Sequence, residues 1–385
     1  MRIHLFALWR LAMCCLVPGV LLGACCLPSA FGGVDHEGDL AVDIPLPERR
    51  VDFPLEEKKP VQKLALKRKE GQSSPDMEKR QELAGLPGKD SSVLKKKKPD
   101  AGPELVLLRR VDQLSLPQSI LFDSKRLRFY VSRLGDDRPK SGAVALLARD
   151  GSVIDLKWVS GLEQPRGMAI AGGRLYVADG KALVVIDIDT GKVVERFAAP
   201  KAFYLNDVVA VANGDLYVTD PLTNSIYVLR DGTSFVLWLQ SSALSGPNGI
   251  MVLGDDLFVG SIGLQIGEKN PEPKGAIFKV SLGSKSVRRF ANGALPPLAG
   301  VVTDGDGHIY ATDDKGALLL KFSLKNGRLL ERLDVGTAFN LKDTVGLGDF
   351  TYLMSSKEFW VPVKSNGHIL VFGRKDAQFT SDDQP

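Results

Sequence analysis

The stretch "YLNDVVAVANGDLYVTD", residues 204–220, contains two polar residues, a strand of small and β-branched residues, a turn, and a second strand with an aromatic residue. Variants of this order open at five further places: Pro117, Pro165, Pro247, Leu298 and Gly348. The six openings recur at intervals of roughly 40 to 50 residues, which is the period of propeller blades. The sequence therefore predicts an all-β fold, a six-bladed β-propeller.

Each opening is followed by further strand patterns that complete a four-stranded blade. A third strand is predicted at "ALVVIDID", "SIYVLRD", "AIFKVSL" and "LLLKFSL", and a variable fourth at "VVERFAA" and "FVLWLQ". These apolar runs are nearly continuous, as expected of sheets covered on both faces by neighbours. A β-sandwich is also built of short strands, but the regular period favours the propeller.

The last unit ends after "HILVFGR" and lacks a clear fourth strand, whereas "ELVLLRRV", residues 104–111, is a spare strand ahead of the first opening. Pairing the two would close the ring and leave no edge unpaired. We therefore expect the propeller to span residues 104–374, with a disordered tail at 375–385.

The N-terminal segment differs from the rest of the chain. In residues 1–24, Arg2 and Arg10 flank a short start, and the apolar stretch "LAMCCLVPGVLLGA" follows, which predicts a signal peptide. All four cysteines lie at 14, 15, 25 and 26, and "LLGAC" resembles the lipobox of bacterial lipoproteins, which predicts lipidation of Cys25. Plain secretion with later cleavage is the alternative. Residues 25–103, rich in proline and charge, predict a disordered linker.

These features predict an exported protein, periplasmic or anchored to the outer membrane of a bacterium, that contacts a membrane only through a lipid. The formal net charge of +4 in 385 residues is too small to argue for a nucleic-acid partner.

Loops that enter the innermost strands of a propeller converge on the central channel. Aligning the six openings predicts a ring of candidate ligand-binding residues at the channel mouth, with Asp207 beside it. The ring residues are Gln118, Arg166, Asn206, Asn248, Ala299 and Asp349. Asn206 and Asp207 could instead bond loop backbone groups, and Arg166 could be a rim charge paired with an exposed carboxylate.

The propeller part, roughly residues 104–374, resembles the regucalcin and gluconolactonase family of calcium- or zinc-dependent lactonases and its NHL-type relatives. The resemblance rests on "YLNDVVAVANGDLYVTD", "PNGIMVLGDDLFV" and "LAGVVTDGDGHIYATDD". It implies that Asn248 stands at a metal-binding position and Asn206 at a substrate-binding position. The family's glutamate and aspartate ligands are replaced by Gln118 and Ala299.

Two neutral replacements matter because calcium and similar cations are held mainly by anionic oxygen. The leading expectation is therefore a propeller without a cofactor that binds a small molecule, peptide or envelope partner in its channel and has no lactonase activity. The alternative is a metal-dependent lactonase or esterase-like hydrolase with a rearranged site, in which Asn248 and Asp349 hold calcium or zinc and Asp349 and Asp207 are the catalytic candidates. An inert scaffold is a third possibility, and the sequence does not decide whether the protein is an enzyme.

Overall fold

The computed structural model describes residues 104–136, 138–264, 274–341 and 346–375. All of them belong to one of two compact units of the chain, Ser92–Pro385. The predicted signal peptide, the lipidation site Cys25 and the linker fall within residues 1–103 and lie outside the described residues, as does the tail from 376 onwards.

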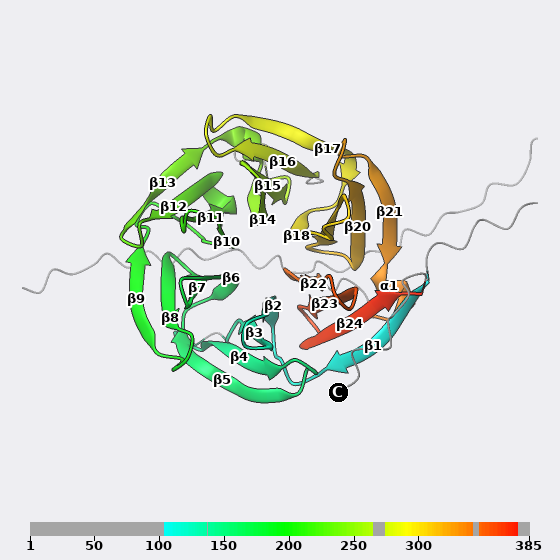
Figure 1. Ribbon diagram of the computed structural model, residues 1–385, viewed down its shortest axis with the longest axis horizontal. Helices are drawn as coiled ribbons and strands as arrows, with labels where there is room; N and C mark the ends of the chain where they lie inside the picture. Colours follow the sequence, from blue (N-terminus) through cyan, green and yellow to red (C-terminus); the bar gives the residue numbers. More distant parts are fainter. Residues whose placement is uncertain (1–103, 137, 265–273, 342–345, 376–385) are drawn as a thin grey trace, which may run out of the picture. The chain divides into compact units, whose positions relative to one another are not determined.

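The described residues form six antiparallel sheets of four strands each, arranged as blades around one axis (Figure 1). Blade 1 contains β2 (Pro117–Asp123), β3 (Arg128–Arg133), β4 (Gly142–Ala148) and β5 (Val153–Leu162). Blade 2 contains β6 (Pro165–Ala171), β7 (Arg174–Asp179), β8 (Ala182–Asp187) and β9 (Val193–Ala198). Blade 3 contains β10 (Val208–Ala210), β11 (Leu216–Asp220), β12 (Ser225–Arg230) and β13 (Ser234–Gln240).

Blade 4 contains β14 (Pro247–Leu253), β15 (Asp256–Ser261), β16 (Gly275–Ser281) and β17 (Val287–Leu295). Blade 5 contains β18 (Leu298–Thr303), β19 (His308–Asp313), β20 (Leu318–Ser323) and β21 (Leu329–Asp334). Blade 6 contains β22 (Thr351–Leu353), β23 (Glu358–Val363), β24 (His368–Arg374) and, from the start of the domain, β1 (Leu105–Val111). The six-bladed prediction is confirmed, and the β-sandwich is excluded.

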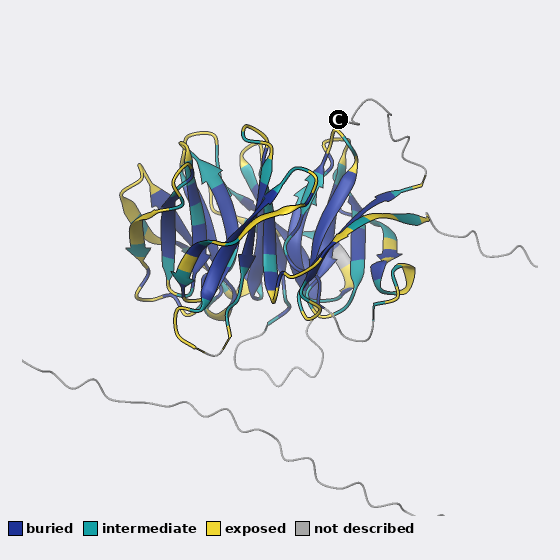
Figure 2. Ribbon diagram, turned by 90° about the horizontal axis from the view of Figure 1, so that it is seen from below, coloured by how far each residue is buried: buried dark blue, intermediate teal, exposed yellow. Residues whose placement is uncertain are grey.

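Burial follows position within a blade, because the inner strands are covered by blades on both sides. In β4, "GAVALLA", six consecutive residues are buried, whereas in the perimeter strand β9, "VVERFA", nearly every residue is exposed. Figure 2 shows the same gradient, with buried strands inside and exposed loops and perimeter strands outside. The hydrophobic core therefore consists of clusters between adjacent blades, such as Phe129, Trp360 and Val371 between blades 1 and 6.

Closure of the ring occurs as expected, since β1 pairs antiparallel with β24 from Leu105 opposite Arg374 to Val111 opposite Ile369. A buried carboxylate strengthens this seam. Glu358 of β23 lies within 3.9 Å of Arg109 from β1 and 3.3 Å of Arg149 from blade 1. Strands from both ends of the domain are thus joined by pairing and by charge.

Helical structure among the described residues is limited to three short segments, η1 (Pro221–Thr223), η2 (Ser242–Leu244) and α1 (Val335–Ala338). Within the described ranges, none of these helices has the length and apolar character needed to cross a membrane.

Candidate functional site

At the start of four blades, the hydrogen-bonded pairing between the first and second strands is interrupted, and the unpaired residues point their side chains toward the channel. In β6, β14 and β18 the ladder pairs the first residue of the strand and then skips two, and in β2 it skips one. The skipped residues are Gln118, Arg166 and Gly167, Asn248 and Gly249, and Ala299 and Gly300. Residues in such a bulge leave the ladder and their side chains are redirected. The bulges explain why the entrance residues line the channel.

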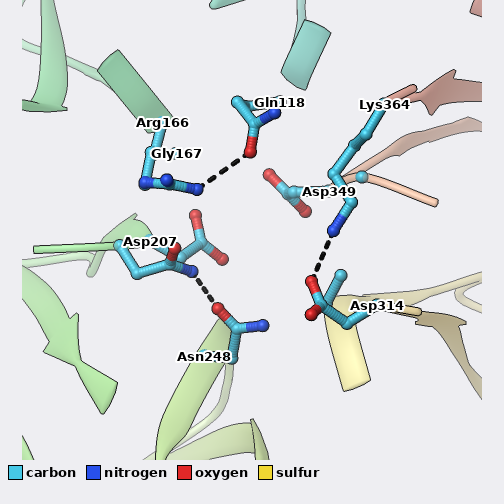
Figure 3. A pocket seen from close by; sticks show the side chains of 11 residues that line it. Gln118, Arg166, Gly167, Asp207, Asn248, Asp314, Asp349 and Lys364 are labelled. Carbon is cyan, nitrogen blue, oxygen red and sulfur yellow. Dashed lines mark hydrogen bonds and ion pairs between the residues drawn. The ribbon is translucent and has the colours of Figure 1, made fainter. Parts of the chain in front are cut away.

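The entrance residues surround one pocket in the channel, with a volume of about 30 Å³. Figure 3 shows the charged and amide side chains converging on it from several blades. Its lining comprises Gln118, Arg166, Gly167, Asn206, Asp207, Asn248, Ala299, Asp314, Gly348, Asp349 and Lys364. Every ring residue predicted from the sequence is among them. A pocket of this volume holds one or two water molecules or an ion, so an organic ligand would place only a small group inside it.

The register of the last blade differs by one residue from the sequence alignment. The Thr219 hydroxyl of blade 3 donates to the carbonyl of Asn248 at 2.6 Å, and the Thr312 hydroxyl of blade 5 donates in the same way to Gly348 at 2.8 Å. Gly348 is therefore the structural equivalent of Asn248. Asp349 stands one position further along, as a counterpart of Asp207 rather than of Asn206.

Asp207 and Asp349 accept matching hydrogen bonds in opposite blades. The Oδ1 of each accepts from the next backbone N–H, at 2.8 Å from Val208 and 2.9 Å from Phe350. The Oδ2 of Asp207 accepts from the Ile250 N–H of blade 4 at 2.8 Å, and that of Asp349 accepts from the Ser119 hydroxyl of blade 1 at 2.6 Å. Each acid therefore joins its own blade to the next.

Glycines in the preceding blades make room for both acids. A Cβ at Gly167 would lie 2.1 Å from Oδ1 of Asp207, and one at Gly300 would lie 2.6 Å from Oδ1 of Asp349. The ring therefore contains a Gly–Asp arrangement twice, in blades 2 and 3 and again in blades 5 and 6. Asp207 therefore bonds to backbone, as the alternative expected, but to that of strands β10 and β14 rather than of loops.

Burial disfavours the charged form of both acids. Loss of solvent raises the pKa of Asp207 well above its usual value, and the nearby charge of Asp349 raises it further. Loss of solvent also raises the pKa of Asp349, to about 6, although the Ser119 hydroxyl opposes the rise. The channel thus contains two neighbouring carboxyl groups that resist ionising together.

Arg166 lines the same pocket and has few partners of its own. Its Nη1 donates to Oε1 of Gln118 at 2.8 Å, and its guanidinium carbon lies 4.1 Å from the centre of the Tyr204 ring. Its Nε is buried and has no hydrogen-bond partner. Burial lowers the Arg166 pKa to about 10, opposed by the charge of Asp314. Among the described residues, no carboxylate forms an ion pair with Arg166, so the expectation of a paired rim charge is not met.

The asparagines expected to bind metal and substrate bond to each other. The Asn206 amide donates to Oδ1 of Asn248, whose own amide donates to the Leu298 carbonyl at 2.7 Å. The Asn248 oxygen that would face a cation therefore already accepts one hydrogen bond, and one lone pair remains. In the part of the chain that the structure describes, no cluster of three or more His, Cys, Asp or Glu side chains is arranged to hold a metal ion.

Sequence reasoning missed two glycines of the pocket lining, Gly167 and Gly348, and two charged residues. Lys364 donates to Asp314 at 2.5 Å, and the two side chains are 21% and 28% exposed, so solvent reaches this side of the pocket. They follow β23 and β19, on the loops that join the second and third strands of their blades. These loops open on the same face as the entrances, and that rule could have identified both residues.

Comparison with known proteins identifies no family for this chain. No family model matches the sequence, and no curated protein matches it. Similar solved structures include a nidogen/laminin complex, with 17% identity over 58% of this chain and 82% of that chain and a TM-score of 0.46. A catalytically inactive virginiamycin B lyase from Staphylococcus aureus with quinupristin shares 14% identity over 70% of this chain and 99% of that chain, with a TM-score of 0.49. At these identities the likeness concerns the propeller fold alone, and no argument about function rests on it.

Proposed function

We propose that this protein is an exported binding propeller that takes a ligand into the mouth of its central channel and does not hydrolyse lactones. The ligand is a small molecule, or the end of a peptide or envelope partner. The main support is the state of the pocket. The pocket contains Arg166, a cation whose Nε is buried and which has no ion-pair partner among the described residues. The side chain of Asn248 accepts a hydrogen bond from Asn206, and neither position 118 nor position 299 carries a carboxylate.

The pocket volume supports binding of a head group rather than enclosure of a whole molecule. About 30 Å³ accommodates a few atoms, so the remainder of a ligand must lie outside the channel mouth. Fold alone does not choose between binding and catalysis, because propellers serve both.

A panel of short probes tests the binding proposal on the full chain. Propionate, propylammonium, propionamide and inorganic phosphate are titrated calorimetrically into the native protein and into Ala299→Leu. Ala299 lines the pocket and is 7% exposed, so the larger side chain should fill the space that a probe occupies. We expect at least one probe to bind the native protein and to lose binding in the variant. If no probe binds, or if binding is unchanged by Ala299→Leu, the proposal is wrong and the inert scaffold is favoured.

The second candidate function is a metal-dependent lactonase or esterase-like hydrolase. Asp207 and Asp349 both line the pocket, which favours it, since each oxygen retains a lone pair for a cation after accepting one hydrogen bond. Against it, both acids have raised pKa values and would have to lose protons to bind a cation.

Export and anchoring are further parts of the proposal. They rest on the leader and on "LLGAC", which would make Cys25 the lipid-bearing residue of a periplasmic or outer-membrane lipoprotein.

A further inference from the structure

Arg166 has a free hydrogen-bonding edge. Its Nη1 is held by Gln118, and the Tyr204 ring lies near the guanidinium. No described residue accepts a hydrogen bond from Nη2, and Nε is buried without a partner. In a guanidinium group, Nε–H and Nη2–H are parallel and form the edge that a carboxylate binds with both oxygens. The edge suited to a bidentate acceptor is therefore the unoccupied one.

The unpaired state of this cation is costly to the free protein. A buried donor without an acceptor has lost its hydrogen bonds to water and gained none in return, and the lowered pKa of Arg166 has the same physical origin. The hydrogen bond to Gln118 (Figure 3) and the contact with the Tyr204 ring nevertheless hold the side chain in place, so little ordering remains to be done when a ligand arrives. Such an arrangement is suited to an incoming acceptor.

The other charged groups of the pocket restrict what that acceptor can be. Lys364 is already paired with Asp314, so it adds little attraction for a second anion. Asp207 and Asp349 face the same space and would repel a doubly charged phosphate more strongly than a singly charged group. A planar, singly charged group of three heavy atoms also suits a volume of about 30 Å³ better than a tetrahedral one.

Building on the proposed binding function, we infer that the channel recognises a carboxylate head group while the rest of the ligand extends out of the mouth. The carboxylate accepts a hydrogen bond from Nη2 of Arg166 and, once the protein atoms that cover Nε move aside, a second one from Nε. Gln118 and Tyr204 are positioning residues for this contact. A short organic acid and a peptide C-terminus share this chemistry. N-acetylalanine, which mimics a peptide C-terminus, and its amide, which lacks the carboxylate, are added to the probe panel. Binding of N-acetylalanine but not of its amide shows that a peptide C-terminus fits, whereas binding of propionate alone indicates a small organic acid.

The test compares propionate with propionamide, which has the same shape without the charge, in calorimetric titrations of the full chain. Arg166→Gln removes the charge and the free edge, and Arg166→Lys keeps the charge but removes the fork. Arg174→Gln is the matched control, because Arg174 lies on the same blade, pairs with Asp187 and does not line the pocket. A thermal scan of each variant verifies folding, and Arg166→Gln should melt close to the native protein. The lost charge has no ion-pair partner, and the loss is confined to the contacts with Gln118 and Tyr204.

We expect propionate to bind the native protein and Arg174→Gln alike, at least about tenfold more weakly to Arg166→Gln, and with intermediate affinity to Arg166→Lys. Propionamide and phosphate should bind at least tenfold more weakly than propionate. Equal binding of propionate and propionamide, or propionate binding that survives Arg166→Gln, overturns the inference. In those cases the binding function stands if Ala299→Leu still abolishes binding, whereas both ideas fall if no probe binds.

Discussion

Replacing Asp349 by asparagine should remove most of one pH-dependent contribution to stability. The Asp349 pKa is raised by burial from 3.8 to about 6, so the folded state holds this proton more tightly than the unfolded chain does. Stability from such a group is fully present below about pH 4 and is lost as pH rises through about 6. Asparagine resembles the neutral acid, because its oxygen can accept from Phe350 and its amide can donate to Ser119.

The magnitude follows from the pKa. One pKa unit corresponds to about 1.4 kcal/mol, so a rise from 3.8 to about 6 amounts to roughly 3 kcal/mol. Asp349 is only half-buried, and solvent at the pocket screens part of this. We therefore expect Asp349→Asn to be about 1–3 kcal/mol more stable than the native protein at pH 8, relative to the difference between them at pH 4.

The assay is the free energy of unfolding from urea titrations at pH 4, 5, 6, 7 and 8, for native protein and variant in parallel. Subtracting the variant's curve of unfolding free energy against pH from the native one removes the contributions of all groups that titrate alike in both proteins. A difference that stays constant with pH, or that favours the variant most at low pH, would refute the reasoning. Asp207→Asn is the contrasting control. Both oxygens of Asp207 accept backbone N–H groups, so an amide must leave one of them unpaired and should destabilise the fold by about 1–3 kcal/mol at pH 4. Because the pKa of Asp207 is raised as well, this cost should fall as pH rises, but Asp207→Asn should remain the less stable of the two variants at pH 4.

Three further predictions concern other parts of the chain. Deleting residues 104–111 removes β1 and exposes the edge of β24, so the protein should aggregate or be proteolysed. Deleting residues 45–95 should leave the melting temperature unchanged, and equal melting temperatures for both deletions would count against closure by β1. Cys25→Ser should release the protein from membranes or block its processing, and unchanged mass and fractionation would end the lipid-anchor hypothesis. Gln118→Glu combined with Ala299→Asp should raise calcium affinity by at least about tenfold in calorimetry. Arg166 limits this gain, because it will pair with the new carboxylate at 118. No gain would show that these two positions do not account for a missing metal site.

Much of the fold could be predicted from the sequence because each blade repeats the same order of strands. The spare strand at residues 104–111 was recognisable for the same reason, since the last repeat lacked a fourth strand. The register of the last opening was not recognisable. In "LGDF" the conspicuous polar residue is Asp349, whereas the hydrogen bond from Thr312 identifies Gly348 as the ring position.

The sequence could predict most of the residues that line the pocket, but not which of them form hydrogen bonds or ion pairs with one another. Sequence position placed Asn206 and Asn248 near the axis, but only coordinates reveal that they bond to each other. The pair of Asp314 and Lys364 was missed because it lies on loops after second strands, where the repeat has no distinctive residue. Whether Arg166 has an ion-pair partner likewise depends on distances between blades far apart in sequence.

The central claim, binding without lactone chemistry, is tested most directly by calorimetric titration of the full chain with calcium, zinc and manganese at neutral pH, combined with a lactone hydrolysis assay. The account predicts no tight, specific binding of any of the three cations and no hydrolysis above background. Tight binding of one cation, together with lactone hydrolysis that Asp349→Ala abolishes, would contradict the account and establish the rearranged hydrolase.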